Sequence, residues 1–139
     1  MTEKSDSLPA QDWVEISQLM SEYNFHLSAG NAEAYAATYT MDGTFVGLEG
    51  KAVTGRDNLV KFIQARNAKP SVQTRTHWAS NIIIRPSANG ATAESYQMTV
   101  DQGGETFRVS GTHIKVDELR RENGKWRFYH RRSVPMARK

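Results

Sequence analysis

"VDELRRENGKWRFYHRR", residues 116–132, contains the strongest folding signal in the chain. Its Asn123-Gly124 pair lies between two runs of alternating apolar and charged residues, and this dipeptide favours the tight turn of an antiparallel hairpin. Further strand-like runs lie upstream, each bounded by turn residues: residues 72–85, 91–101 and 105–121. The second half of the chain therefore predicts a meander of about four long strands.

The residues before this meander have the period of helices instead. Apolar side chains recur every three or four residues from Pro9 onward, at Trp13, Ile16, Met20, Tyr23 and Leu27. Two shorter helices are predicted over residues 32–39 and 54–69, the latter with Thr54 as its N-cap, and a short strand begins at Phe45 between them. Helices followed by strands predict an α+β fold, with three N-terminal helices packed on one face of a curved, mostly antiparallel sheet.

Length and composition favour one folded domain. The chain has 139 residues, of which 38% are hydrophobic and 24% charged, and we expect a flexible lead-in over residues 1–8 and a single domain over residues 9–139. The absence of cysteine excludes disulfides, thiolate zinc sites and cysteine nucleophiles. The polar start has neither a signal-peptide core nor a membrane span, so we expect a cytoplasmic protein that has no membrane partner.

The net charge of +3 does not by itself indicate a nucleic-acid partner. Much of the positive excess lies in residues 118–132 and at the C-terminus, and no recognition motif accompanies it. Basic residues at a sheet edge also protect against aggregation. We therefore expect no nucleic-acid binding.

Polar residues of the strand over 72–85 are the first candidates for a site. Alternate residues of a strand share a face, so His77 and Asn81 lie on one face unless a bulge intervenes, and Trp78, Ile82 and Ile84 lie on the other. The concave face of a curved sheet can enclose a pocket, into which these two polar groups would point. The alternative for His77 is a core histidine hydrogen-bonded to a backbone carbonyl.

The strand over 105–121 predicts a similar pattern. Phe107, Val109 and His113 fall on one face by parity, so His113 is a second candidate for the cavity. The four histidines do not have metal-site spacing, and no glycine-rich phosphate loop or nucleophile elbow is present. We expect neither a metal nor a cofactor.

Taken together, residues 11–134 resemble the SnoaL-like branch of the nuclear transport factor 2-like superfamily. Four segments carry the likeness: "SEYNFHLSAGNAEAYAATYTMDGTF" (21–45), "GRDNLVKFI" (55–63), "THWASNIII" (76–84) and "VDELRRENGKWRFYHRR" (116–132). The resemblance implies a cone-shaped α+β barrel with a ligand pocket inside. It implies much less about function, because this fold hosts lyases, isomerases, hydrolases and proteins that only bind.

Within that superfamily the layout is most similar to scytalone dehydratase-like lyases, which use no cofactor. The resemblance implies that His77 is the general base and that Tyr23 polarises a substrate carbonyl, although Tyr23 could equally be a core residue. Ser28 falls where these lyases carry an aspartate that assists the histidine, and a hydroxyl cannot replace its charge. Asp101, at the end of the next strand, is a candidate substitute.

Two hypotheses for function follow. In the first, a cofactor-free lyase or isomerase acts by acid–base chemistry on a small, largely apolar cyclic substrate, with His77, Tyr23 and Asp101 catalytic. Further residues are expected to bind that substrate: Ser28, Tyr39, Phe45, Asn81 and His113. In the second, the domain is a non-catalytic module for ligand binding or assembly. In both we expect a homo-oligomer, a dimer or larger, formed through the outer sheet face, where Trp78, Tyr96 and Ile114 would give an apolar patch.

Overall fold

The computed structural model describes residues 7–136 and forms three helices and a six-stranded sheet. The helices are α1 (Ala10–Ala29), α2 (Ala32–Ala37) and α3 (Arg56–Asn67), and a single 3-10 turn, η1, covers Pro70–Val72. The strands are β1 (Tyr39–Val46), β2 (Ala52–Thr54), β3 (Arg75–Ser87), β4 (Gly90–Asp101), β5 (Arg108–Glu122) and β6 (Lys125–Pro135). The expected lead-in lies outside the described residues except for Ser7 and Leu8, and Leu8 packs against the core.

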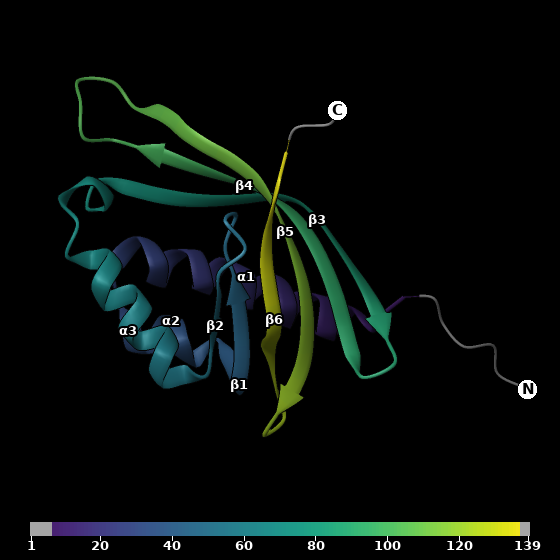
Figure 1. Cartoon of the computed structure of the whole chain (residues 1–139). Helices are drawn as coiled ribbons and strands as arrows, with labels where there is room; N and C mark the ends of the chain where they lie inside the picture. The colour runs from purple at the N-terminus through teal and green to yellow at the C-terminus, as the bar shows by residue number, and fades with distance from the viewer. Residues whose placement is uncertain (1–6, 137–139) are drawn as a thin grey trace, which may run out of the picture.

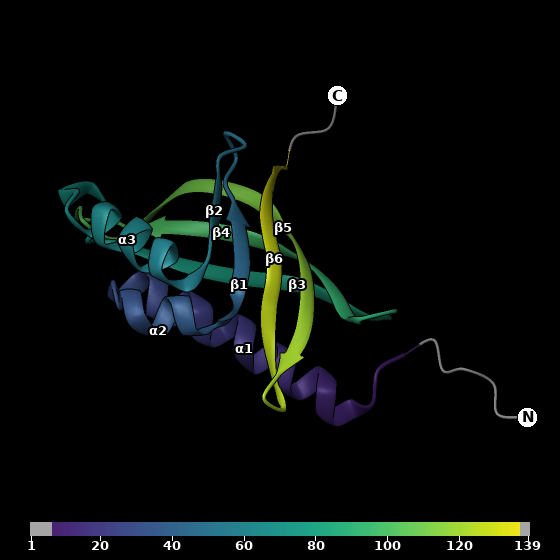
Figure 2. The same ribbon diagram turned by 60° about the horizontal axis from the view of Figure 1, so that its bottom comes forward.

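The sheet confirms the predicted α+β architecture. Its strand order is β2-β1-β6-β5-β4-β3, and every neighbouring pair is antiparallel except β1 and β6, which are parallel. The long strands bend strongly, and the helices lie on the concave side (Figure 1). A second view shows α1 crossing beneath the sheet while α2 and α3 lie beside its β1–β2 end (Figure 2). None of the described helices is long and apolar enough to cross a membrane.

Local sequence explains the helix boundaries. Gly30 ends α1 in the left-handed conformation, with a φ of 70°, which glycine adopts without steric penalty. Asn31 then caps α2, because its side chain accepts a hydrogen bond from the Ala34 N–H at 3.1 Å. The prediction of Thr54 as a cap was wrong: Thr54 ends β2, a strand the sequence did not reveal, and Gly55 precedes α3.

The core lies between α1 and the sheet. Ile16, Leu19, Met20 and Tyr23 are all buried along one side of α1, as the periodicity predicts. Trp13, near the start of the helix, departs from this stripe and is 45% exposed. Burial of each large apolar side chain contributes about 1.5–3 kcal/mol, so this face of α1 anchors the helix to the sheet.

Two β-bulges change which residues face inward. In β3 the register shifts between Ser80 and Ile83, and Asn81 has a φ of 55°. Beyond this bulge Ile82 and Ile84 pack against the core. The prediction that they share the outer face with Trp78 was therefore wrong, because an extra residue reverses the alternation.

The second bulge lies in β5. Thr99 pairs with Gly111 but Val100 pairs with Val109, which leaves Ser110 as the extra residue. Val109 is consequently 50% exposed, while His113 turns toward the interior. The predicted common face of Val109 and His113 was wrong for the same reason as in β3.

Candidate functional site

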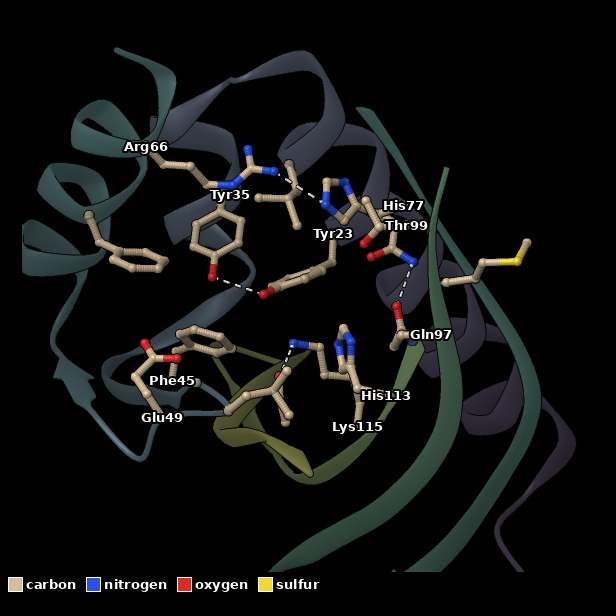
Figure 3. Close-up of a pocket in the computed structure, with 17 residues that line it drawn as sticks. Tyr23, Tyr35, Phe45, Glu49, Arg66, His77, Gln97, Thr99, His113 and Lys115 are labelled. Atoms are coloured by element: carbon tan, nitrogen blue, oxygen red, sulfur yellow. Dashed lines mark hydrogen bonds between the residues drawn. The ribbon is translucent and has the colours of Figure 1, made fainter. Parts of the chain in front are cut away.

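A cavity of about 240 Å³ lies between the helices and the concave face of the sheet. Its apolar walls include Phe45 from β1 and Phe62 from α3, whose ring centroids are 5.6 Å apart. Polar side chains reach it from three sides: Tyr23 from α1, His77 from β3, and His113 and Lys115 from β5 (Figure 3). Glu49, in the loop between β1 and β2, also lines it.

His77 is held by one hydrogen-bonding group on each ring nitrogen. Nδ1 lies 3.1 Å from Ser28 Oγ, which also accepts a hydrogen bond from the His77 backbone N–H at 3.0 Å. Nε2 lies 3.3 Å from Arg66 Nη2. A guanidinium can only donate, so Nε2 is the accepting nitrogen and the ring proton is on Nδ1. The lone pair of His77 therefore faces the Arg66 side of the cavity.

The surroundings keep this imidazole neutral. Burial and, after it, the positive charges of Arg66, Lys115 and Arg75 together lower the pKa of His77 from 6.5 to about 4. Neither ring nitrogen has a carboxylate as its hydrogen-bond partner among the described residues. Ser28 orients the ring but supplies no charge to stabilise an imidazolium.

Three tyrosine hydroxyls meet beside the cavity. Tyr23 Oη lies 2.8 Å from Tyr35 Oη, and Tyr39 Oη lies 3.4 Å from Tyr35 Oη and 3.5 Å from Tyr23 Oη. Burial raises the pKa of Tyr35 and of Tyr39 well above the usual value. These two hydroxyls stay protonated and can donate hydrogen bonds to Tyr23, whose ring lines the cavity.

A buried ion pair supports the tyrosines from behind. Arg131 Nε lies 3.0 Å from Asp117 Oδ1, and both side chains are fully buried. The Arg131 guanidinium also lies 4.2 Å from the centroid of the Tyr23 ring and 4.3 Å from that of Phe128. This cation–π contact holds the Tyr23 ring in place.

The family model for the SnoaL-like domain matches residues 9–132. The chain belongs to the SnoaL-like family. A comparison with curated proteins finds no match. Among solved structures, the domain is similar to a protein of unknown function with a cystatin-like fold from Nostoc punctiforme, at 30% identity and a TM-score of 0.81, over 92% of this chain and 93% of that one.

Two further structures share the fold of this SnoaL-like domain at lower identity. One is a nuclear transport factor 2-like protein from Novosphingobium aromaticivorans, 19% identical with a TM-score of 0.84, covering 93% of this chain and 84% of that one. The other is a protein from Catenulispora acidiphila in complex with S-DNPA, 22% identical with a TM-score of 0.80, covering 90% and 95%. The cone-shaped fold implied by the sequence is therefore confirmed.

The SnoaL-like cavity brings together most of the residues singled out from the sequence. Tyr23, Phe45, His77 and His113 line it, while Ser28 and Tyr39 reach it through their hydrogen bonds to His77 and Tyr23. His113 Nε2 is buried and has no hydrogen-bond partner in the described part of the chain. The burial of His113 and the nearby Lys115 lower its pKa from 6.5 to about 4.

Asn81 and Asp101 lie elsewhere. Asn81 is exposed at the β3 bulge, which turns its side chain out of the cavity. Asp101 accepts hydrogen bonds from Thr74 Oγ1 at 2.8 Å and from the Gly103 N–H at 3.0 Å, and these bonds lower its pKa. The Asp101 carboxylate therefore forms these bonds at the end of β4, where Asp101 pairs with Arg75. His77 pairs instead with Thr99, two residues earlier in β4.

Three charged residues of the site, Glu49, Arg66 and Lys115, were not predicted from the sequence. Arg66 lies one turn after Phe62 on α3 and points to His77, and Lys115 lies two residues after His113 on the same face of β5. A signal for Lys115 was present, because His113, Lys115, Asp117 and Leu119 alternate with residues of the opposite face. No three His, Cys, Asp or Glu side chains within residues 7–136 are grouped so that they could hold a metal ion.

Proposed function

We propose that this SnoaL-like protein is a cofactor-free lyase or isomerase that acts on a small, largely apolar cyclic carbonyl compound. The observation that carries the proposal is the shared cavity of a neutral imidazole and a tyrosine: His77 accepts through Nε2, and Tyr23 belongs to a hydrogen-bonded set of three hydroxyls. A base and an oxyanion donor in a water-poor site are sufficient for proton transfer next to a carbonyl.

In the proposed reaction, His77 Nε2 removes a proton from the carbon beside the substrate carbonyl. The Tyr23 hydroxyl donates a hydrogen bond to the oxygen on which negative charge develops, and Tyr35 donates in turn to Tyr23. A hydroxyl on the next carbon then leaves as water with the proton held by His77, or that proton returns at another carbon, and either event completes a lyase or an isomerase turnover. Both outcomes need the same two groups, so the geometry supports the pair of reactions equally.

Arg66 has opposite effects on the two charges that this proton transfer creates, the imidazolium of His77 and the enolate of the substrate. Its charge disfavours an imidazolium at His77, which contributes to the low pKa of that ring. Proton transfer also creates an enolate, however, and a negative oxygen placed near Arg66 offsets the new positive charge on His77. The net charge of the cluster is unchanged by the transfer, so Arg66 favours substrates that form an oxyanion.

The cavity also defines the class of ligand. The neighbouring Phe45 and Phe62 rings favour an apolar body, and the other, polar side chains that line the cavity favour one or two oxygen atoms. The complex of the Catenulispora acidiphila protein with S-DNPA supports the use of this fold for binding a small molecule.

A second candidate is a module that binds such a ligand without converting it. The observation that favours it is the lack of a carboxylate partner for His77, since an imidazole with a pKa of about 4 is a weak base. In that case His77 and Arg66 would only hydrogen-bond the ligand.

A pair of measurements distinguishes the lyase or isomerase from the non-catalytic binding module. A thermal-shift screen of cyclic hydroxyketones and phenols identifies ligands, and each ligand is then followed by NMR for conversion with wild type and with His77→Asn. The lyase or isomerase proposal predicts conversion by the wild type, and a loss of about 10²-fold or more in the variant, the usual scale of general-base catalysis. Conversion at an equal rate by the variant would refute the assignment of His77.

We also propose that a second copy of the chain covers the outer face of the sheet. Trp78 is 53% exposed and Tyr96 is 41% exposed there, and Tyr96 pairs with Ile114 of the next strand. Large apolar side chains grouped on a sheet face are typical of a protein–protein interface. Light scattering over a concentration series tests this proposal, and a 15.6 kDa particle at every concentration would refute it.

A further inference from the structure

Lys115 is a buried amine that the proposed acid–base reaction does not use. It extends from β5 into the cavity, and its side chain is only 6% exposed. Nζ hydrogen-bonds Ser133 Oγ at 2.7 Å and lies 4.6 Å from the centroid of the Phe45 ring (Figure 3). Within residues 7–136 no carboxylate forms an ion pair with Nζ, and its hydrogen-bond partner is the Ser133 hydroxyl.

The charged neighbours of Lys115 come from three elements. Arg131 on β6 repels a positive charge at Nζ, whereas Asp117 on β5 attracts it but already pairs with Arg131 at 3.0 Å. His113 on β5 is neutral at pH 7, because its pKa is about 4, and Glu49 lines the cavity from the β1–β2 loop. Burial, followed by Arg131, lowers the pKa of Lys115 to about 7.

From this geometry we propose that Lys115 forms a Schiff base with an aromatic or cyclic aldehyde or ketone bound in the cavity. A desolvated lysine beside another cation is the environment that activates amine nucleophiles. Phe45, whose ring centroid lies 4.6 Å from Nζ, and Phe62 would pack against the ring of such a ligand, and Ser133 orients the amine. The inference adds a covalent site to the protein and does not depend on turnover through His77.

The step is balanced without any co-reactant. The Nζ lone pair attacks the carbonyl carbon, and one of the two amine protons moves to the carbonyl oxygen to give a carbinolamine. The hydroxyl then leaves as water with the remaining amine proton, and a C=N bond replaces the C=O bond. A cavity with apolar walls favours this loss of water and slows the reverse hydrolysis.

Reductive trapping tests the proposal on the 139-residue chain. The protein is incubated at pH 7 with benzaldehyde and sodium cyanoborohydride, which reduces an imine to a stable amine, and the modified lysines are located by peptide mass spectrometry. The structure predicts preferential modification of Lys115 over the exposed Lys51, Lys61 and Lys125. An ordinary lysine, with a pKa near 10.4, has on the order of 10³ times less free base at pH 7, so we expect at least a tenfold preference.

Matched variants make the result specific. Lys115→Met fills the same space without an amine, Lys115→Arg keeps the charge without the nucleophile, and Lys61→Met makes the same change on the surface of α3. The first two should lose the trapped adduct, and the third should retain it, with circular dichroism to verify folding. The peptide map of the wild-type protein identifies the modified lysine by itself. The proposal therefore remains testable even if a variant fails to fold.

Two results would overturn the Schiff base. One is modification spread evenly over the exposed lysines, and the other is the absence of an adduct at Lys115. Neither result bears on the conversion assay with His77→Asn, because trapping requires no turnover. Conversely, a trapped adduct in a protein without lyase or isomerase activity would support Lys115 and refute only the acid–base proposal.

Discussion

Replacing Ser28 by aspartate should restore the charge that the His77 imidazole lacks. Ser28 Oγ lies 3.1 Å from His77 Nδ1, so a carboxylate at this position comes within about 4 Å of the ring. At that separation, and at an effective dielectric constant of about 20, the attraction is about 4 kcal/mol, or about three pKa units. An opposite charge at this range typically raises a histidine pKa by about one to three units. Ser28→Asp should therefore raise the pKa of His77 from about 4 to about 5–7.

An NMR titration of the His77 ring protons from pH 3.5 to pH 8.5 measures this shift. Ser28→Asn is the matched control, because it has the size of aspartate but no charge and should leave the midpoint within about half a unit of the wild type. If the midpoint in Ser28→Asp also stays near 4, the electrostatic reasoning about this site is refuted. If the shift occurs and His77 is the base, the conversion rate at pH 7 should rise with it.

Three further predictions concern stability and assembly. Between pH 6.5 and pH 4 the folded state binds fewer protons than the unfolded chain, because folding lowers the pKa values of His77 and His113 to about 4. The free energy of unfolding measured with urea should therefore be about 2–4 kcal/mol lower at pH 4 than at pH 6.5. His77→Asn should reduce this pH dependence. Arg131→Met leaves Asp117 unpaired and buried, and it should lower the free energy of unfolding by about 3–5 kcal/mol in the same assay. A decrease of less than about 1 kcal/mol would contradict the ion pair. Trp78→Lys should shift a dimer to monomer in light scattering while thermal stability stays within a few degrees, and an unchanged dimer would place the interface elsewhere.

The elements of this fold could be predicted because their signals are local. Asn123-Gly124 specified the β5–β6 hairpin, and Gly30 and Asn31 specified the break between α1 and α2. The bulge at Asn81 could not be located in the same way, because asparagine tolerates a positive φ but a single asparagine in a strand-like run does not specify an inserted residue. A single inserted residue then reversed the orientation of every side chain that followed it.

The site was predicted only in part because its chemistry depends on contacts between distant elements. His77 and Ser28 were found from the sequence, yet their contact joins α1 to β3 across 49 residues. Arg66 looked like an ordinary surface residue of α3, and its role depends on how that helix packs beside β3. Lys115 could have been found from its parity with His113, which places a charged residue at an inward position.

The protonation of His77 at neutral pH tests the account most directly. Long-range ¹H–¹⁵N NMR of the wild-type protein at pH 7 distinguishes a protonated from an unprotonated ring nitrogen. We expect a neutral ring with its proton on Nδ1 and a lone pair on Nε2, and a change in the Nε2 signal when a ligand from the screen is added. An imidazolium at pH 7, or a proton on Nε2, would contradict the assignment of His77 as a base facing the cavity.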